Sequence, residues 1–120
     1  IVKKGINHPT EAVVEWTTAG MDILHGINAV PHGLVYPGKI SPLADVGGGA
    51  ISGADITKIA LEDNYKSRKA TDVPMIFGGG NTNVDDVKRC FDLGADAVSI
   101  CTVASEDTVE AERIIRFFNT

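Results

Sequence analysis

Hydrophobic and polar positions follow two different periods along this chain, which predicts strands alternating with helices. Short apolar runs at 22–27, 74–78 and 97–101 are typical of buried strands. Between them apolar residues recur every three or four positions, as on one face of a helix. We therefore expect the following elements in chain order: strand 1–4, helix 10–19, strand 22–27, loop 28–52, helix 54–69, strand 74–78, helix 84–93, strand 97–101 and helix 106–118.

Residues at the predicted helix ends support these boundaries. Asn83 and Ser105 stand where N-caps are expected, and Gly20 and Gly94 stand where C-terminal caps are expected. A weak internal repeat, in which a glycine, a small or apolar residue and an aspartate lead into a strand, follows two of the helices. Such repetition is expected of stacked βα units.

Strands that alternate with helices imply a parallel sheet, and a parallel sheet is buried on both faces. The chain has helices enough to cover only one face, so we expect the remaining strands of a closed barrel to cover the other. We predict an α/β fold of the TIM (βα)8-barrel class, which usually needs about 250 residues. Residues 1–120 would then form a single partial domain, and we expect further residues before Ile1, which lies within a predicted strand.

A small doubly wound sheet is the alternative fold. It is disfavoured because the chain lacks an early Gly-x-Gly-x-x-Gly fingerprint.

Composition excludes several functions. The 120 residues carry a formal net charge of −5 with no cluster of lysine and arginine, which argues against nucleic-acid binding. No apolar run approaches the roughly 18 residues that a membrane span needs. Cys90 and Cys101 lack metal-ligand spacing, so we expect free thiols in a reducing compartment such as the cytoplasm. The histidines show no ligand spacing either, and we predict no metal site.

The loop at 28–52 is far longer than the roughly 2–6 residues of an ordinary βα connection. A long structured loop at the carboxyl end of a strand is where a barrel enzyme keeps its substrate cover. An inert insertion is the alternative.

Two small-residue turns, one βα unit apart, indicate a phosphate site. The first is Gly78-Gly79-Gly80, where glycine permits positive φ and close approach to a ligand. The second is Cys101-Thr102, whose amides and hydroxyl could complete a cradle of backbone N–H groups. Plain tight turns are the alternative, and burial alone would make Cys101 a packing residue.

The glycine-rich stretch 47–53 could aim backbone N–H groups at an anion or at the edge of a planar ring. A flexible linker is the alternative.

Lys3 and Lys4 end the first strand, and alternation sends their side chains to opposite faces of the sheet. We take Lys3 as the lysine that points inward, where its ammonium could stabilise an anionic reduced flavin. Two solvated lysines are the alternative.

Asn28 follows the second strand. Counting back by two places Asn28 on the face of Gly26 and Leu24, with His25 packed between strand and helix. The Asn28 amide could both donate to and accept from a heterocycle. A turn asparagine is the alternative.

In this order, the residues resemble the C-terminal half of the class 1 dihydroorotate dehydrogenase and dihydropyrimidine dehydrogenase family, FMN enzymes built on a βα barrel. The likeness covers nearly the whole chain and rests on five motifs: Ile1-Val2-Lys3, Gly26-Ile27-Asn28, Ile51-Ser52-Gly53-Ala54, Val73-Pro74-Met75-Ile76 with Gly79-Gly80, and Ser99-Ile100-Cys101-Thr102.

The resemblance implies FMN as cofactor and hydride transfer between the flavin and the C5–C6 bond of a dihydropyrimidine, of dihydroorotate or dihydrouracil type. It assigns Asn28 to both substrate and cofactor. It implies the following cofactor contacts: Lys3, Asn28, Ser52, Gly53, Gly79, Gly80, Cys101 and Thr102.

Three departures leave the substrate open. Ala29 replaces the usual threonine or serine, and Ala50 stands where a second glycine of the helix entry is usual. Cys101 replaces the glycine of the dihydroorotate branch and is closer to the dihydropyrimidine dehydrogenase branch. The family's catalytic base, a cysteine or serine on a loop, belongs to the other half of the barrel. We therefore assign no catalytic residue here and expect the 120-residue chain alone to show no turnover.

Two other functions stay open. The chain could belong to another phosphate-binding barrel, an isomerase or synthase of a phosphorylated metabolite. It could also be a non-catalytic half barrel. The expected partners are a small pyrimidine substrate and either the missing N-terminal half barrel or a second chain, and an open sheet face predicts a homo-oligomer.

Overall fold

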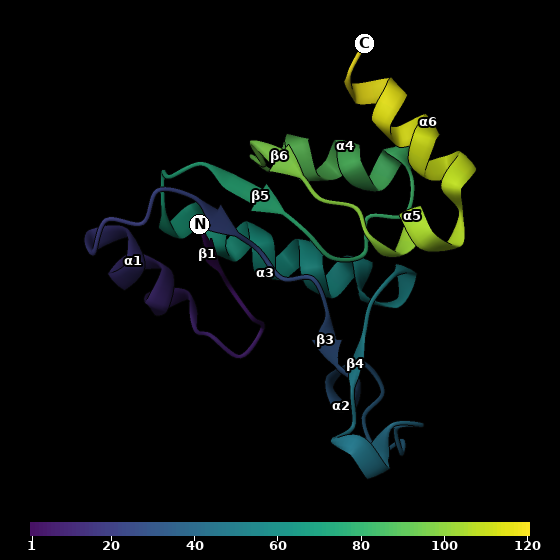
Figure 1. Cartoon of the computed structure of the whole chain (residues 1–120). Coiled ribbons are helices and arrows are strands. Elements are labelled where there is room, and N and C mark those ends of the chain that lie inside the picture. Colours follow the sequence, from purple (N-terminus) through teal and green to yellow (C-terminus); the bar gives the residue numbers. More distant parts are fainter.

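Four short strands form one parallel sheet in the computed structural model, which describes residues 1–120 (Figure 1). Their order is β1 (Val2–Lys3), β2 (Leu24–His25), β5 (Met75–Phe77) and β6 (Ala97–Val98). Neighbours in the sheet are consecutive βα units, as short right-handed crossovers require. The strands are shorter than predicted, because the chain leaves the ladder at the turns that follow each one.

The helices that connect these strands are α1 (Thr10–Thr18), α3 (Thr57–Ala70) and α4 (Val84–Asp92), and α6 (Thr108–Phe118) follows the last strand. A single turn of 3-10 helix, Ala54–Ile56, leads into α3. None of the helices combines the length and the apolar character needed to cross a membrane.

Three of the four predicted caps are confirmed. Asn83 Oδ1 accepts from the Asp86 amide at 2.9 Å, which satisfies a free donor of α4. Gly20 and Gly94 take φ values of +97° and +99°, the left-handed conformation of a helix end. The Ser105 prediction is wrong. A separate short helix, α5 (Thr102–Glu106), precedes α6, and Asp107 is the residue that caps α6.

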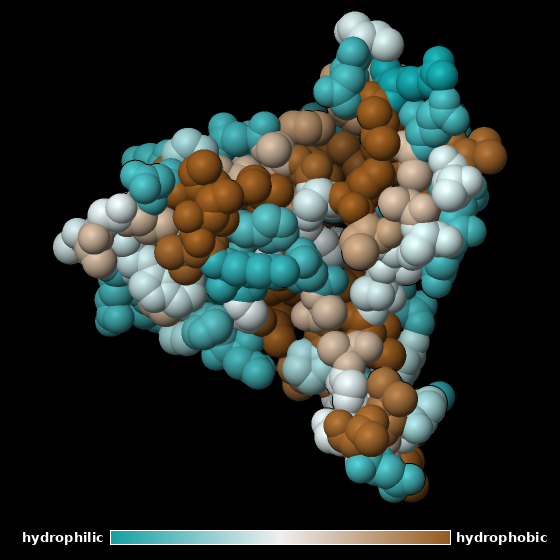
Figure 2. All heavy atoms as spheres, viewed as in Figure 1, coloured by the Kyte–Doolittle hydropathy of each residue, from teal (hydrophilic) through white to brown (hydrophobic).

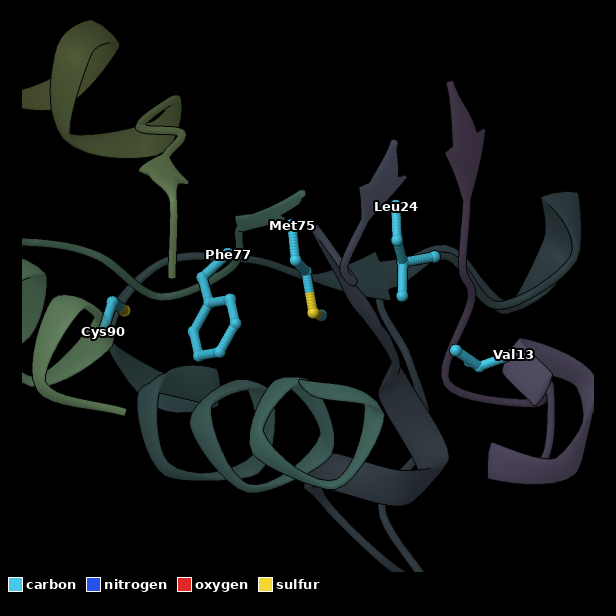
Figure 3. Close-up of a cluster of buried hydrophobic side chains, with 5 residues drawn as sticks. All are labelled: Val13, Leu24, Met75, Phe77 and Cys90. Carbon is cyan, nitrogen blue, oxygen red and sulfur yellow. The ribbon is translucent and has the colours of Figure 1, made fainter. Parts of the chain in front are cut away.

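One face of the sheet carries the main core (Figure 3). Leu24, Met75 and Phe77 point from neighbouring strands toward the helices, where they meet Val13 of α1 and Cys90 of α4. All five are at most 3% exposed. Alternation along a strand sends the next residues to the other side.

The opposite face of the sheet is open. It carries a row of register partners, of which Lys3 and Ala97 are exposed and His25 and Ile76 are half-buried. The molecule is accordingly thin, measuring 39 × 36 × 19 Å. Because helices cover only one face, the doubly wound alternative is wrong.

Lys4 is not solvated, contrary to the alternative considered for the two lysines. It is 2% exposed, and its ammonium donates to both carboxylate oxygens of Asp63 on α3, at 2.9 and 3.1 Å. This ion pair fastens β1 to the helix layer and leaves Lys3 on the open face.

The predicted loop 28–52 is a folded arm that projects from the body of the molecule (Figure 1). Its base is an antiparallel pair, β3 (Val30–Pro31) with β4 (Ala50–Ile51). Between these strands lie α2 (His32–Val35) and a 3-10 turn, Ala44–Val46. The segment is therefore structured, and its role as a substrate cover stays a prediction.

An apolar hollow of about 380 Å³ lies where β6, α4 and α6 meet. Apolar residues gather over these elements on the surface (Figure 2). Phe91, Ile115 and Phe118 contribute to its wall.

Candidate functional site

The carboxyl ends of β2, β5 and β6 open onto one shared pocket of about 230 Å³. In a sheet of this type ligands bind at the carboxyl ends of the strands, where the loops converge. No aspartate or glutamate is among its eleven lining residues, so the pocket is chemically suited to an anion. The lining consists of His25, Asn28, Gly53, Gly79, Gly80, Asn81, Thr82, Ser99, Ile100, Cys101 and Thr102.

The turn after β5 is pressed against the start of α3. Gly79 and Gly80 take φ values of +85° and +70°, which L side chains rarely adopt. A Cβ at Gly80 would lie 2.4 Å from the Cα of Thr57. The Thr57 hydroxyl also donates to the Gly80 carbonyl oxygen at 2.6 Å. Only glycine fits this turn, and Gly79 and Gly80 both line the pocket.

The turn after β6 is joined to the end of the arm. The Thr102 hydroxyl donates to Ser52 Oγ at 2.8 Å. Gly53 follows with φ +79°, and a Cβ there would meet Thr102 Cγ2 at 3.2 Å. Cys101 is exposed, so the alternative that it is a packing residue is wrong. Ser52, Gly53, Cys101 and Thr102, four of the residues that the resemblance implied as cofactor contacts, thus lie together.

Backbone N–H groups on both turns lack an acceptor within the chain. They belong to Gly79, Gly80 and Asn81 on the first turn and to Ile100 and Cys101 on the second. The Thr82 amide differs, because it and the Thr82 hydroxyl both donate to Asp86 Oδ2, at 3.0 and 2.8 Å. Five free donors around a pocket without carboxylates form the kind of cradle that holds a phosphate group.

Asn28 and His25 face the pocket together. A Cβ at Gly78 would lie 2.7 Å from Asn28 Oδ1 and 2.9 Å from His25 Cε1. The expectation that Asn28 shares a face with Leu24, and that His25 packs against a helix, is therefore wrong. The cause is that β2 ends at His25, so alternation does not continue to residue 28. His25 Nδ1 lies 2.7 Å from the Gly26 carbonyl oxygen.

Lys3, one of the predicted site residues, does not line the pocket. It is the register partner of His25 on the adjacent strand and is exposed on the open face of the sheet. Any contact of Lys3 with a ligand would therefore be made on that face.

Sequence reasoning missed five lining residues: His25, Asn81, Thr82, Ser99 and Ile100. Four of them adjoin the predicted turns, and that proximity was the available signal. Asn81 links the two turns, since its Nδ2 donates to the Ser99 carbonyl oxygen at 3.1 Å. The Cys90 thiol in turn donates to Asn81 Oδ1 at 3.2 Å.

The two cysteines are expected to differ strongly in reactivity. Burial, with a smaller contribution from the negative charge of Asp86, raises the pKa of Cys90 to about 12. Alkylation of the native protein at pH 8 with iodoacetamide should modify Cys101 alone, as read by intact mass, with Cys90 reacting only after unfolding. Cys101→Ser should remove the fast reaction. Rapid double labelling of the native wild-type protein would contradict this prediction.

The same shift has a defined effect on stability. Between the ordinary thiol pKa of 9 and the raised value of about 12, the unfolded chain loses a proton that the folded chain keeps. The free energy of unfolding should therefore fall as pH rises through this window. Denaturant melts from pH 8 to 11 should show this fall, and Cys90→Ala should flatten it.

Comparisons with known proteins place this geometry in a family. A family model described as "Histidine biosynthesis protein" matches residues 44–120, which hold both glycine- and threonine-bearing turns. Because the match covers well over half of the chain, the chain belongs to this family of βα barrels.

Other relatives are dihydroorotate dehydrogenases, as the sequence resemblance implied. The chain is 31% identical over 114 residues to dihydroorotate dehydrogenase B (NAD(+)), catalytic subunit, of Oceanobacillus iheyensis, covering 85% of this chain and 38% of that protein. It is 37% identical over 67 residues to the protein of the same name from Staphylococcus carnosus, covering 56% and 22%. The chain thus spans well under half the length of the curated relatives it matches.

A solved structure confirms the predicted barrel fold. DHODH from Eimeria tenella, in complex with ferulenol, superposes with a TM-score of 0.74 at 22% identity, over 94% of this chain and 31% of that one. The half-barrel expectation agrees with this coverage and with the one-sided helix layer.

Proposed function

We propose that this chain is the phosphate-anchoring part of an FMN-dependent barrel oxidoreductase that acts on the C5–C6 bond of a dihydropyrimidine. One observation carries the proposal: five backbone N–H groups without an acceptor belong to residues of two consecutive turns that line a pocket without carboxylates. The names of the curated relatives support dihydroorotate as the substrate type. The dihydrouracil type is supported by the sequence resemblance alone.

Residues in different parts of the pocket would contact different parts of FMN. Gly79, Gly80, Cys101 and Thr102 would hold the phosphate of FMN through backbone amides, with the Thr102 hydroxyl tying the second turn to Ser52. Ser52 and Gly53, which pack on the second turn, would line the cofactor from the side of the arm.

The reactive part of the ligand would meet other residues. Asn28 would orient the pyrimidine, because its amide can donate and accept at once. Lys3 would balance the negative charge of the reduced ring from the open face. FMN, when bound, supplies the acceptor for a hydride. We assign no catalytic base to this chain.

The open sheet face and the apolar hollow support a partner. We propose that residues 1–120 are a partial domain, the C-terminal half of a barrel. Further strands, from another part of the polypeptide or from a second chain, would cover the row with Lys3, His25 and Ile76. Assembly into a homo-oligomer would cover the hollow beside β6. The two free cysteines support a reducing compartment, the cytoplasm.

A second candidate function is an isomerase or synthase of a phosphorylated metabolite. The family description that matches residues 44–120 favours it, because that segment contains both turns but not Asn28 or Lys3. The same cradle would then hold a phosphate without a flavin.

Titration of the chain with FMN tests the proposal. We expect saturable quenching of flavin fluorescence, and about tenfold weaker binding in Thr102→Val, which loses the hydrogen bond that ties the second turn to Ser52. Thr18→Val is the matched control, because Thr18 is exposed on α1 and its hydroxyl donates only to the Val14 carbonyl oxygen. Binding of inorganic phosphate without any binding of FMN would overturn the flavin proposal and favour the second candidate.

A further inference from the structure

A buried asparagine on α3, Asn64, reaches the ends of two different strands. Asn64 is 1% exposed. Its Oδ1 accepts from the Ile27 amide at 3.2 Å, and its Nδ2 donates to the Gly78 carbonyl oxygen at 2.8 Å. We propose that Asn64 is the positioning residue that holds Asn28 and the Gly79–Gly80 turn in one pocket.

The two hydrogen bonds of Asn64 are made to backbone groups just beyond the carboxyl ends of β2 and β5. β2 ends at His25 and β5 ends at Phe77, so Ile27 and Gly78 lie just beyond the ladder. Each directly precedes a pocket residue, Asn28 in one case and Gly79 in the other. Both bonds are buried, and a buried backbone group without a partner is costly. The fold therefore fixes both segments through the one side chain.

Asparagine is chemically suited to this place. One of its bonds needs an acceptor and the other a donor, and the short amide offers both. An aspartate would keep the acceptor for the Ile27 amide but lose the donor for Gly78. A leucine of similar size would lose both.

The chain makes room for Asn64 with a glycine. A Cβ at Gly26 would lie 1.9 Å from Asn64 Oδ1. Gly26 has no positive φ, so its backbone does not require glycine. Space for the Asn64 amide is the reason for glycine here, and the motif Gly26-Ile27-Asn28 thus serves the strand end as well as the ligand.

The effect of Asn64 on binding rests on the proposed function of the pocket, whereas its effect on geometry does not. Two measurements separate them: the amide resonances of Asn28, Gly79 and Gly80 in the ligand-free protein, and the dissociation constant for FMN. We expect Asn64→Leu to shift all three resonances and to weaken FMN binding at least tenfold.

Two matched variants separate positioning from general stability. Ser67→Ala changes a fully buried polar residue on the same helix whose hydroxyl has no partner, and should change neither readout. Val13→Ala opens a cavity in the core beneath the sheet, and should lower Tm while leaving the FMN constant within twofold.

The amide resonances and the FMN affinity of the Asn64 variants decide whether Asn64 has this role. Unshifted resonances or wild-type FMN affinity in folded Asn64→Leu would overturn the role of Asn64. If Asn64→Leu does not fold, Asn64→Asp serves instead and should shift Gly79 and Gly80 more than Asn28; unshifted resonances there would also overturn it. If the wild-type protein binds no FMN, the proposed function fails, and the resonance shifts alone decide the positioning.

Discussion

The substitution Gly80→Ala is expected to weaken FMN binding about 100-fold and to lower the free energy of unfolding by about 3 kcal/mol. Gly80 has φ +70°, and an added Cβ would lie 2.4 Å from the Cα and 2.6 Å from the N of Thr57. These are backbone atoms at the start of α3, so no side-chain rotation relieves the clash. The turn must move, and its free amides move with it.

Gly20→Ala is the matched control for Gly80→Ala. Gly20 has φ +97°, and nothing lies within 4 Å of its added Cβ. The Gly20→Ala variant should lose only about 1 kcal/mol of unfolding free energy, from backbone strain, and should bind FMN as the wild type does. Isothermal titration and denaturant melts measure both quantities. A Gly80→Ala protein that binds FMN like the wild type would show that the first turn does not hold the ligand.

Removing the carboxylate of Asp63 is expected to be the most destabilising change away from the pocket. Lys4 is 2% exposed, and its only carboxylate partner is Asp63, at 2.9 Å. Asp63→Ala leaves an ammonium buried without its counter-ion, which should cost about 3 kcal/mol and lower Tm by roughly 10 °C.

Two further variants identify the cause. The double variant Lys4→Met with Asp63→Leu should recover most of the loss, because it leaves no buried charge. Glu62→Ala, one residue away, breaks a 4.0 Å pair with Lys58 whose side chains are 61% and 88% exposed, and should cost less than about 1 kcal/mol. Equal melting temperatures for Asp63→Ala and Glu62→Ala would contradict the burial argument.

The fold could be predicted because its signals are local. Apolar period distinguished helix from strand at every βα unit, and Asn83, Gly20 and Gly94 marked helix ends by their own backbone chemistry. The boundary near residue 106 failed because Ser105 and Asp107 are both good caps. The choice between them depends on how α5 turns after β6.

The glycine and threonine turns could also be predicted as a pair, since each follows its strand directly. The directions of the His25 and Asn28 side chains could not be predicted from the sequence. His25 and Asn28 face the same pocket because β2 is two residues long, and beyond it the period of two no longer holds.

The order of the βα units and the two turns at the end of the sheet follow from the sequence alone. Spacing along the chain sets both, through the periods of strand and helix and the backbone freedom of glycine. Three contacts depend on the packing of the folded chain: the burial of Lys4 against Asp63, the hydrogen bond between Thr102 and Ser52 of the arm, and the bridge from Asn64 to Ile27 and Gly78. Each of these contacts joins residues far apart in the chain, and their partners become defined only when the helices pack on the sheet.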